Sequence, residues 1–151
     1  MHKTLLMLAA GAALFAAAPA FAQTPRPAAH PEEPALRAAL EHYLAGHATG
    51  DPNEHRQAFH DEARLMWIRE GAVATRSDDE YIAGSSGKPA ADEAQRKRWI
   101  QSIDITGTAA SAKIVLDYPN AVLTDYMQLL KTPQGWKIVH KIFDVAPKKK
   151  P

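Results

Sequence analysis

The sequence predicts an α+β fold in which helices come first and a mostly antiparallel sheet follows. Residues 34–50 carry apolar side chains at helical spacings of three and four. Residues 96–145 instead alternate apolar and polar side chains with the period of two that is typical of strands. We therefore expect about three amino-terminal helices packed on a curved, mixed or antiparallel sheet with an internal cavity.

The first predicted helix begins at Pro34, which suits the first turn of a helix, and ends at Gly50. Its apolar face includes two polar residues, Tyr43 and His47. We expect Tyr43 to pack with its hydroxyl at a rim and His47 to be exposed near the helix end. A ligand-binding role for either residue is the alternative.

Two shorter helices are predicted from their caps. Asp51-Pro52 can cap and begin a helix that runs to about Ala58. Ser77 followed by Glu80 has the spacing of a capping box, which predicts a third helix. The glycine, serine and proline residues of 84–95 predict a loop after it, of the kind that can cover a pocket.

Strands are predicted wherever side chains alternate between two turn signals. The first pair, Leu65 to Arg69 and Ala72 to Arg76, is joined by the turn Glu70-Gly71. Two more strands cover residues 96–106, with Trp99 on the same side as Ile103 and Ile105, and residues 109–118, with Tyr118 on the side of Ile114 and Leu116.

The last two strands form a hairpin that holds the best candidate for chemistry. Residues 121–131 and 136–143 flank the turn Thr132-Pro133-Gln134-Gly135. Pairing Lys131 with Trp136 would set Met127 opposite His140, with Asp125 diagonal to that imidazole on the inner face. Lysines 137 and 141 would then mark the solvent face. A slip of one residue in this register would turn Asp125 outward.

The ends of the chain indicate export. Residues 1–22 combine a basic start, an apolar core and a small-residue site ending at Ala22, which is typical of a bacterial secretory signal peptide. Residues 23–34 are a proline-rich linker, residues 35–146 the folded domain and residues 147–151 a basic tail. We expect a periplasmic or secreted protein, free of the membrane after cleavage at about Ala22.

Composition narrows the possible partners. The formal net charge of +1 becomes zero when Lys3 is removed with the signal peptide, and the lysines near the carboxyl end predict a solvated tail, so nothing favours nucleic acid. The chain has no cysteine, so its stability depends on its hydrophobic core. His42 and His47, five residues apart, would lie on different faces of a helix, so we expect no metal site.

The element order resembles that of the nuclear transport factor 2-like (NTF2-like) superfamily. The stretches that carry the resemblance are Ala58-Phe59-His60-Asp61-Glu62-Ala63 before the first strand, residues 124–131, and Trp136-Lys137-Ile138-Val139 in the last. Within the superfamily the chain looks most like the putative lumazine-binding proteins, near the polyketide-cyclase (SnoaL-like) and ketosteroid-isomerase relatives. The resemblance implies a cone-shaped α+β domain with an inward-facing cavity, often a homodimer through its sheet.

Three functions follow as hypotheses. The first is a domain that binds a small, partly apolar or aromatic molecule in the cone, and the second an isomerase, dehydratase or cyclase that uses Asp125 and His140 for acid–base catalysis without a cofactor. The third is a dimeric interaction domain. Whether the protein is an enzyme stays open. The candidate ligand-binding residues are the tyrosines, tryptophans and methionine expected to line the cavity: Tyr43, Trp67, Tyr81, Trp99, Tyr118 and Met127.

Overall fold

A computed structural model describes residues 30–149. The predicted signal peptide, most of the linker and the last two residues lie outside the described residues. The elements follow the predicted order: α1 (Glu33–Thr49), α2 (Pro52–Ala58), β1 (Phe59–Arg69), β2 (Ala72–Ser77), α3 (Asp78–Ile82), the 3-10 helix η1 (Glu93–Gln95), β3 (Lys97–Thr106), β4 (Ala109–Asp117), β5 (Ala121–Thr132) and β6 (Gly135–Pro147).

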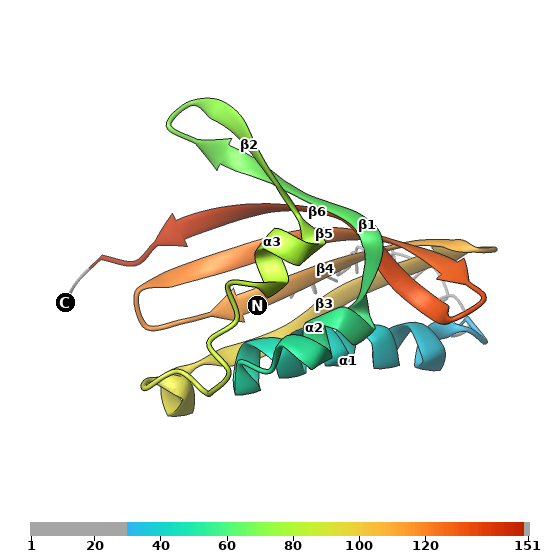
Figure 1. The fold of residues 1–151 in the computed structure, drawn as a ribbon, viewed down its shortest axis with the longest axis horizontal. Coiled ribbons are helices and arrows are strands. Elements are labelled where there is room, and N and C mark those ends of the chain that lie inside the picture. Colours follow the sequence, from blue (N-terminus) through green and yellow to red (C-terminus); the bar gives the residue numbers. More distant parts are fainter. Residues whose placement is uncertain (1–29, 150–151) are drawn as a thin grey trace, which may run out of the picture.

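The strands form one six-stranded sheet in the order β2-β1-β6-β5-β4-β3. The β1 and β6 strands pair in parallel, and the other neighbours pair antiparallel. Figure 1 shows α1 and α2 along one face of the curved sheet, while the β1–β2 hairpin rises beyond them. The predicted α+β cone is confirmed, and its sheet is mixed.

The helix ends follow the predicted signals. Gly50 ends α1 in the left-handed conformation, with φ at 73°, and donates its N–H to the carbonyl of Gly46. The Asp51 side chain accepts from the N–H of Asn53 at the start of α2. Ser77 and Glu80 form the complete capping box of α3. Short local motifs therefore set the end of α1 and the starts of α2 and α3.

The β1 strand is longer than predicted, because it begins at Phe59 rather than at Leu65. Phe59 pairs with Ile138 of β6, and a register shift follows before Arg64 pairs with His140. Because a parallel partner lies far along the chain, local alternation could not show that residues 59–64 would be drawn into the sheet.

The inner face of the sheet carries the core, which α1 covers with Leu36, Leu40 and Tyr43. The β1 strand contributes Ala63 and Leu65, and β6 contributes Trp136 and Ile138. The β4 and β5 strands contribute buried side chains of the same kind: Ala112, Ile114, Leu116, Met127 and Leu129. Side chains thus fill much of the cone, and Met127 is a core residue only 1% exposed.

The predicted face of Trp99 is wrong. A register shift between Ile100 and Ser102 places Ile103 on the inner face while Trp99 lies outside, 44% exposed. Arg98 accordingly points inward. A bulge inserts one unpaired residue and so reverses which side chains face the core on either side of it.

Candidate functional site

A second bulge decides which polar side chain of β6 enters the cone. The predicted register holds from Lys131, opposite Trp136, to Leu129, opposite Ile138, and then shifts by one residue. Beyond the shift Gln128 faces His140 and Met127 faces Lys141. The inferred pairing of Asp125 with His140 is therefore wrong, since His140 lies on the outer face.

Lys141, expected on the solvent face, is instead part of a buried polar network. Its Nζ donates to the Tyr43 hydroxyl at 2.9 Å and lies 3.2 Å from Asp125 Oδ1. The Tyr43 hydroxyl in turn donates to Asp125 Oδ2 at 2.6 Å. The Oδ1 contact lacks hydrogen-bond geometry, so it is an ion pair without a directed donor. None of the three residues is more than 3% exposed.

Burial sets the protonation of this network. Burial lowers the pKa of Lys141, and the Asp125 carboxylate opposes that shift. Burial also raises the pKa of Tyr43 well above 10.0, and the negative charge of Asp125 raises it further. Tyr43 therefore keeps its proton at neutral pH and donates it in the hydrogen bond to Asp125. Its hydroxyl is not available to a ligand, contrary to the role we considered for it from the sequence.

A second network surrounds His47, which α1 turns inward rather than toward solvent. The Tyr118 hydroxyl lies 3.2 Å from His47 Nδ1, and the Tyr81 hydroxyl lies 2.9 Å from Nε2. Arg98 donates from Nε to the Tyr118 oxygen at 3.2 Å, and both of its terminal nitrogens bind the carboxylate of Glu93. Burial lowers the pKa of His47 well below 6.5, and the positive charge of Lys141 adds to this, so the ring is neutral.

His55 packs against His47 with its ring centroid 5.3 Å away. It is 5% exposed and lies over Gly46, where an added Cβ would approach within 2.5 Å of its Nε2. Burial lowers its pKa to about 4, although the backbone of Tyr43 acts against the shift. No acceptor within the described chain meets hydrogen-bond geometry at Nε2. Gly46 weakens α1 but leaves the space that this ring occupies.

These rings open onto a pocket of about 230 Å³ between the end of α1, the start of α2 and the loop after α3. The N–H of Gly87 donates to the carbonyl of Gly50 at 2.9 Å and holds the loop there. A Cβ on Gly50 would lie 2.3 Å from the Lys88 carbonyl, so only glycine allows this approach. The lining includes no carboxylate and consists of Gly46, His47, Gly50, His55, Tyr81, Gly84, Ser85, Ser86, Lys88, Ala90 and Arg96.

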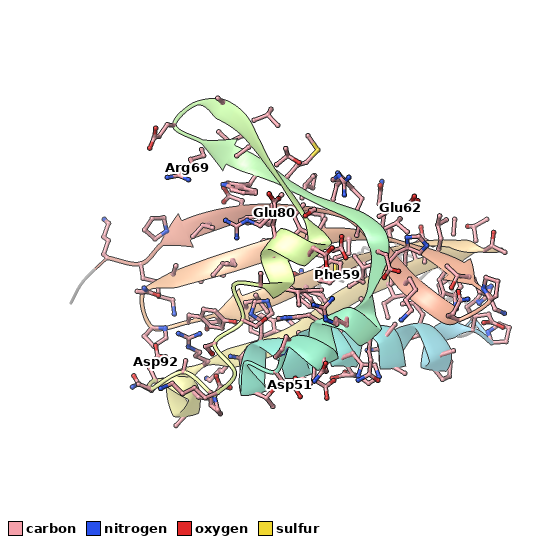
Figure 2. The ribbon with its side chains drawn as sticks, in the orientation of Figure 1. Asp51, Phe59, Glu62, Arg69, Glu80 and Asp92 are labelled. Atoms are coloured by element: carbon pink, nitrogen blue, oxygen red, sulfur yellow. The ribbon has the colours of Figure 1, made fainter. Side chains whose placement is uncertain are left out.

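Phe59 connects the pocket to the core. It contacts Tyr43 and Tyr81 edge-on, with ring centroids 5.9 Å and 5.6 Å away. Figure 2 places Phe59 at the start of β1 beside α3, and Asp51 at the outer side of α2. Tyr81 thus separates the pocket from Lys141, whose Nζ lies 5.2 Å from the centre of its ring. Polar side chains thus line the pocket, and the ion pair of Lys141 and Asp125 lies behind it.

Comparison with known proteins identifies the family to which this fold belongs. A family model described as "Putative lumazine-binding" matches residues 31–144, which is more than half of the chain. The chain belongs to this family. No curated protein matches it significantly.

Solved structures similar to this family member share the fold. An NTF2-like protein of unknown function from Shewanella baltica is 28% identical, with a TM-score of 0.70 over 78% of this chain and 95% of that one. A second, from Methylobacillus flagellatus, is 25% identical, with a TM-score of 0.65 over 79% and 95%. A third, from Silicibacter pomeroyi, is 24% identical and supports the fold alone. Family and fold together support a ligand-binding domain of NTF2-like architecture.

The structure separates most of the residues expected to line one cavity in this family member. Tyr81 lines the pocket and Tyr118 lies one hydrogen bond behind it. Trp67 stacks on Phe143 with centroids 5.3 Å apart, away from the pocket, while Trp99 lies on the outer face. His140 borders a different depression on the outer face, next to Gln128.

Four important residues were missed or placed on the wrong face: His47, His55, Arg98 and Lys141. The histidine pair compared in the sequence, His42 and His47, lies on a single helix, whereas His47 and His55 meet across the turn between α1 and α2. The signal that could have found them was Gly46, a glycine within a helix. Arg98 and Lys141 were hidden by the two bulges, which alternation alone does not show.

Two further observations bear on the expected partners. Among residues 30–149 no group of three or more His, Cys, Asp or Glu side chains is arranged to hold a metal ion. The described helices also include none with the length and apolar character needed to cross a bilayer.

Proposed function

We propose that this protein is an exported binding domain whose small, partly aromatic ligand occupies the pocket at His47, His55 and Tyr81. The observation that carries the proposal is the convergence of two neutral imidazoles, His55 buried and His47 half-buried, and a phenol on one pocket. Polar groups that line a pocket are costly to desolvate unless they find partners, and the hydroxyls of Tyr81 and Ser85 line this one. A ligand that supplies hydrogen-bond partners to them would explain why they are there.

The composition of the pocket suggests what would fit. The flat rings of His47, His55 and Tyr81 can contact an aromatic ring edge-on or by stacking. Lys88 and Arg96 add positive charge at the opening, although Arg96 also pairs with Asp92 at 2.7 Å. A flat molecule with a polar or negatively charged end would match both features.

Native mass spectrometry of protein purified from its own compartment tests this proposal. The expected result is an intact mass for a chain that begins at Gln23, together with a bound small molecule that denaturing extraction releases. The extra mass should disappear in Ser85→Leu, because Ser85 lines the pocket and its Oγ lies 3.4 Å from His55 Nδ1.

Ser111→Leu is the matched control for this experiment. Ser111 is exposed on the outer face of β4 and borders depressions of about 370 Å³ and 470 Å³ there. A ligand retained by Ser85→Leu and lost by Ser111→Leu would place the site on the outer face and refute the proposal.

We further propose that the outer face of the sheet forms a homodimer. Ile68 and Val73 are a directly paired couple, 67% and 66% exposed, and Tyr126 pairs with Ile142 on the neighbouring strands. These side chains border a largely apolar depression of about 360 Å³. A twofold interface brings the same patch of both copies together, and two exposed apolar patches would favour such an association.

Light scattering after size exclusion tests the dimer. The expected result is a dimeric wild type and a monomeric Ile142→Lys variant, since the lysine would place a charge in the apolar patch. Val145→Lys is the control, because Val145 is also on β6 and is 45% exposed but lies outside that patch. A monomeric wild type would exclude this interface.

A further inference from the structure

The hydrogen bonds around His47 run in one direction from Arg98 to the pocket. Arg98 can only donate, so its Nε occupies an acceptor position on the Tyr118 oxygen at 3.2 Å. The Tyr118 hydroxyl hydrogen then has one acceptor among the described groups, His47 Nδ1 at 3.2 Å. The reverse arrangement would leave that hydrogen without a partner at Tyr118, which is only 8% exposed, whereas the hydrogen left free in this arrangement belongs to Tyr81, which lines the pocket.

The tautomer of His47 follows from this direction. A neutral imidazole carries one hydrogen, and a ring that accepts at Nδ1 must carry it on Nε2. Nε2 then donates to the Tyr81 oxygen at 2.9 Å. Glu93 keeps Arg98 in place through two bonds of 2.6 Å and 2.7 Å, and Arg98 also donates to the His47 carbonyl at 3.2 Å.

The Tyr81 hydroxyl hydrogen remains for a ligand. The Tyr43 hydroxyl donates to Asp125 and accepts from Lys141, and its contact with Tyr81, which affects the pKa of both phenols, does not meet hydrogen-bond geometry. No other acceptor for the Tyr81 hydroxyl is found within residues 30–149. Tyr81 lines the pocket, which Lys88 and Arg96 also border.

We infer that Arg98 and Tyr118 are positioning residues that hold His47 as its Nε2–H tautomer, so that Tyr81 donates its hydroxyl hydrogen to an acceptor oxygen of an aromatic carboxylate. The inference rests on the proposed pocket, and it adds the polarity of the ligand. The preferred ligand accepts hydrogen bonds at the Tyr81 end, and molecules of the same shape that can only donate there are rejected.

The ring nitrogen shifts of ¹⁵N-histidine-labelled protein test the tautomer without any ligand. The expected spectrum at pH 7.5 shows His47 with a protonated Nε2 and an unprotonated Nδ1. Assignment by comparison with His47→Gln identifies the signals. A protonated Nδ1 in the wild type would overturn the inference, whether or not the pocket binds small molecules.

Two probes of one shape test the polarity. Benzoate offers only acceptors and benzamidinium only donors, so calorimetry should show benzoate binding at least about tenfold more tightly. Tyr81→Phe should weaken the binding of benzoate about tenfold, because it removes the hydrogen bond to the ligand. Tyr118→Phe should weaken it about threefold, because it removes the hydrogen bond that orients His47. Trp99→Phe, a change of an aromatic side chain that is 44% exposed on the outer face, should have no effect.

The outcomes separate this inference from the proposed function. Preference for benzamidinium, or benzoate binding unaffected by Tyr81→Phe, would refute the ligand polarity. If Ser85→Leu still removes a co-purified ligand in that case, the pocket remains the binding site and only its polarity is wrong. Equal thermal unfolding midpoints for the phenylalanine variants and the wild type exclude misfolding as the cause.

Discussion

The Asp125→Ala variant is expected to lose about 3–5 kcal/mol of unfolding free energy, because it leaves the Lys141 ammonium buried without its counter-charge. Lys141 Nζ has Asp125 and the Tyr43 hydroxyl as its polar partners, and the side chain is 4% exposed. Tyr43 would also lose the acceptor at 2.6 Å. Urea unfolding followed by circular dichroism at pH 7.5 measures the loss.

Replacing both charges should restore most of that stability. Asp125→Leu combined with Lys141→Met removes the ion pair and keeps apolar volume, so the double variant should lie within about 1–2 kcal/mol of the wild type. Asp117→Ala is the control, because Asp117 pairs with Lys148 near the surface and its loss should cost at most about 1 kcal/mol. A single Asp125→Ala variant as stable as this control would contradict a buried, interdependent pair.

Stability should also fall by about 3 kcal/mol between about pH 6.5 and pH 4 through His55 alone. Burial lowers the pKa of its ring from 6.5 to about 4 in the folded protein. Between these values the unfolded chain binds a proton that the folded chain excludes, so lowering the pH favours unfolding. The full loss of stability from His55 is reached below about pH 4, and none of it is present above about pH 6.5. The lowered pKa of His47 makes stability fall with pH in the same direction.

Urea unfolding across this pH range, compared with His55→Gln, checks the effect. Glutamine does not titrate, so from pH 7 to pH 4 the wild type should lose about 3 kcal/mol of unfolding free energy more than the variant does. Carboxylates that titrate in the same range cancel in this difference. A constant difference would show that His55 is protonated as easily in the folded protein as in the unfolded one.

The sequence predicted the fold well where local chemistry determines it. Gly50, Asp51 and the Ser77–Glu80 capping box gave the correct helix ends, and the turns gave the correct order of strands. The site was predicted poorly because it depends on long-range register. Alternation extrapolated across the β5–β6 shift put His140 inside and Lys141 outside, and the structure has the reverse.

The same reasoning explains the missed histidines. Periodicity within α1 placed His47 on the apolar face, but its meeting with His55 depends on how α2 packs back onto α1. Gly46 allows that close approach, and a glycine in a helix does not by itself say what occupies the space it leaves. Arg98 entered the site through a strand irregularity that leaves no mark in hydropathy.

The bond between Gly87 and Gly50 has a consequence for the rate at which a molecule could exchange with solvent. The outer side of the pocket, residues 84–90, is joined to the end of α1 by this one backbone hydrogen bond among the described contacts. Breaking such a bond costs about 1 kcal/mol, so the loop could move away from α1 often while the ion pair of Lys141 and Asp125 stays intact. Residence time would then depend on the ligand's own contacts with the rings, and the core would not need to rearrange.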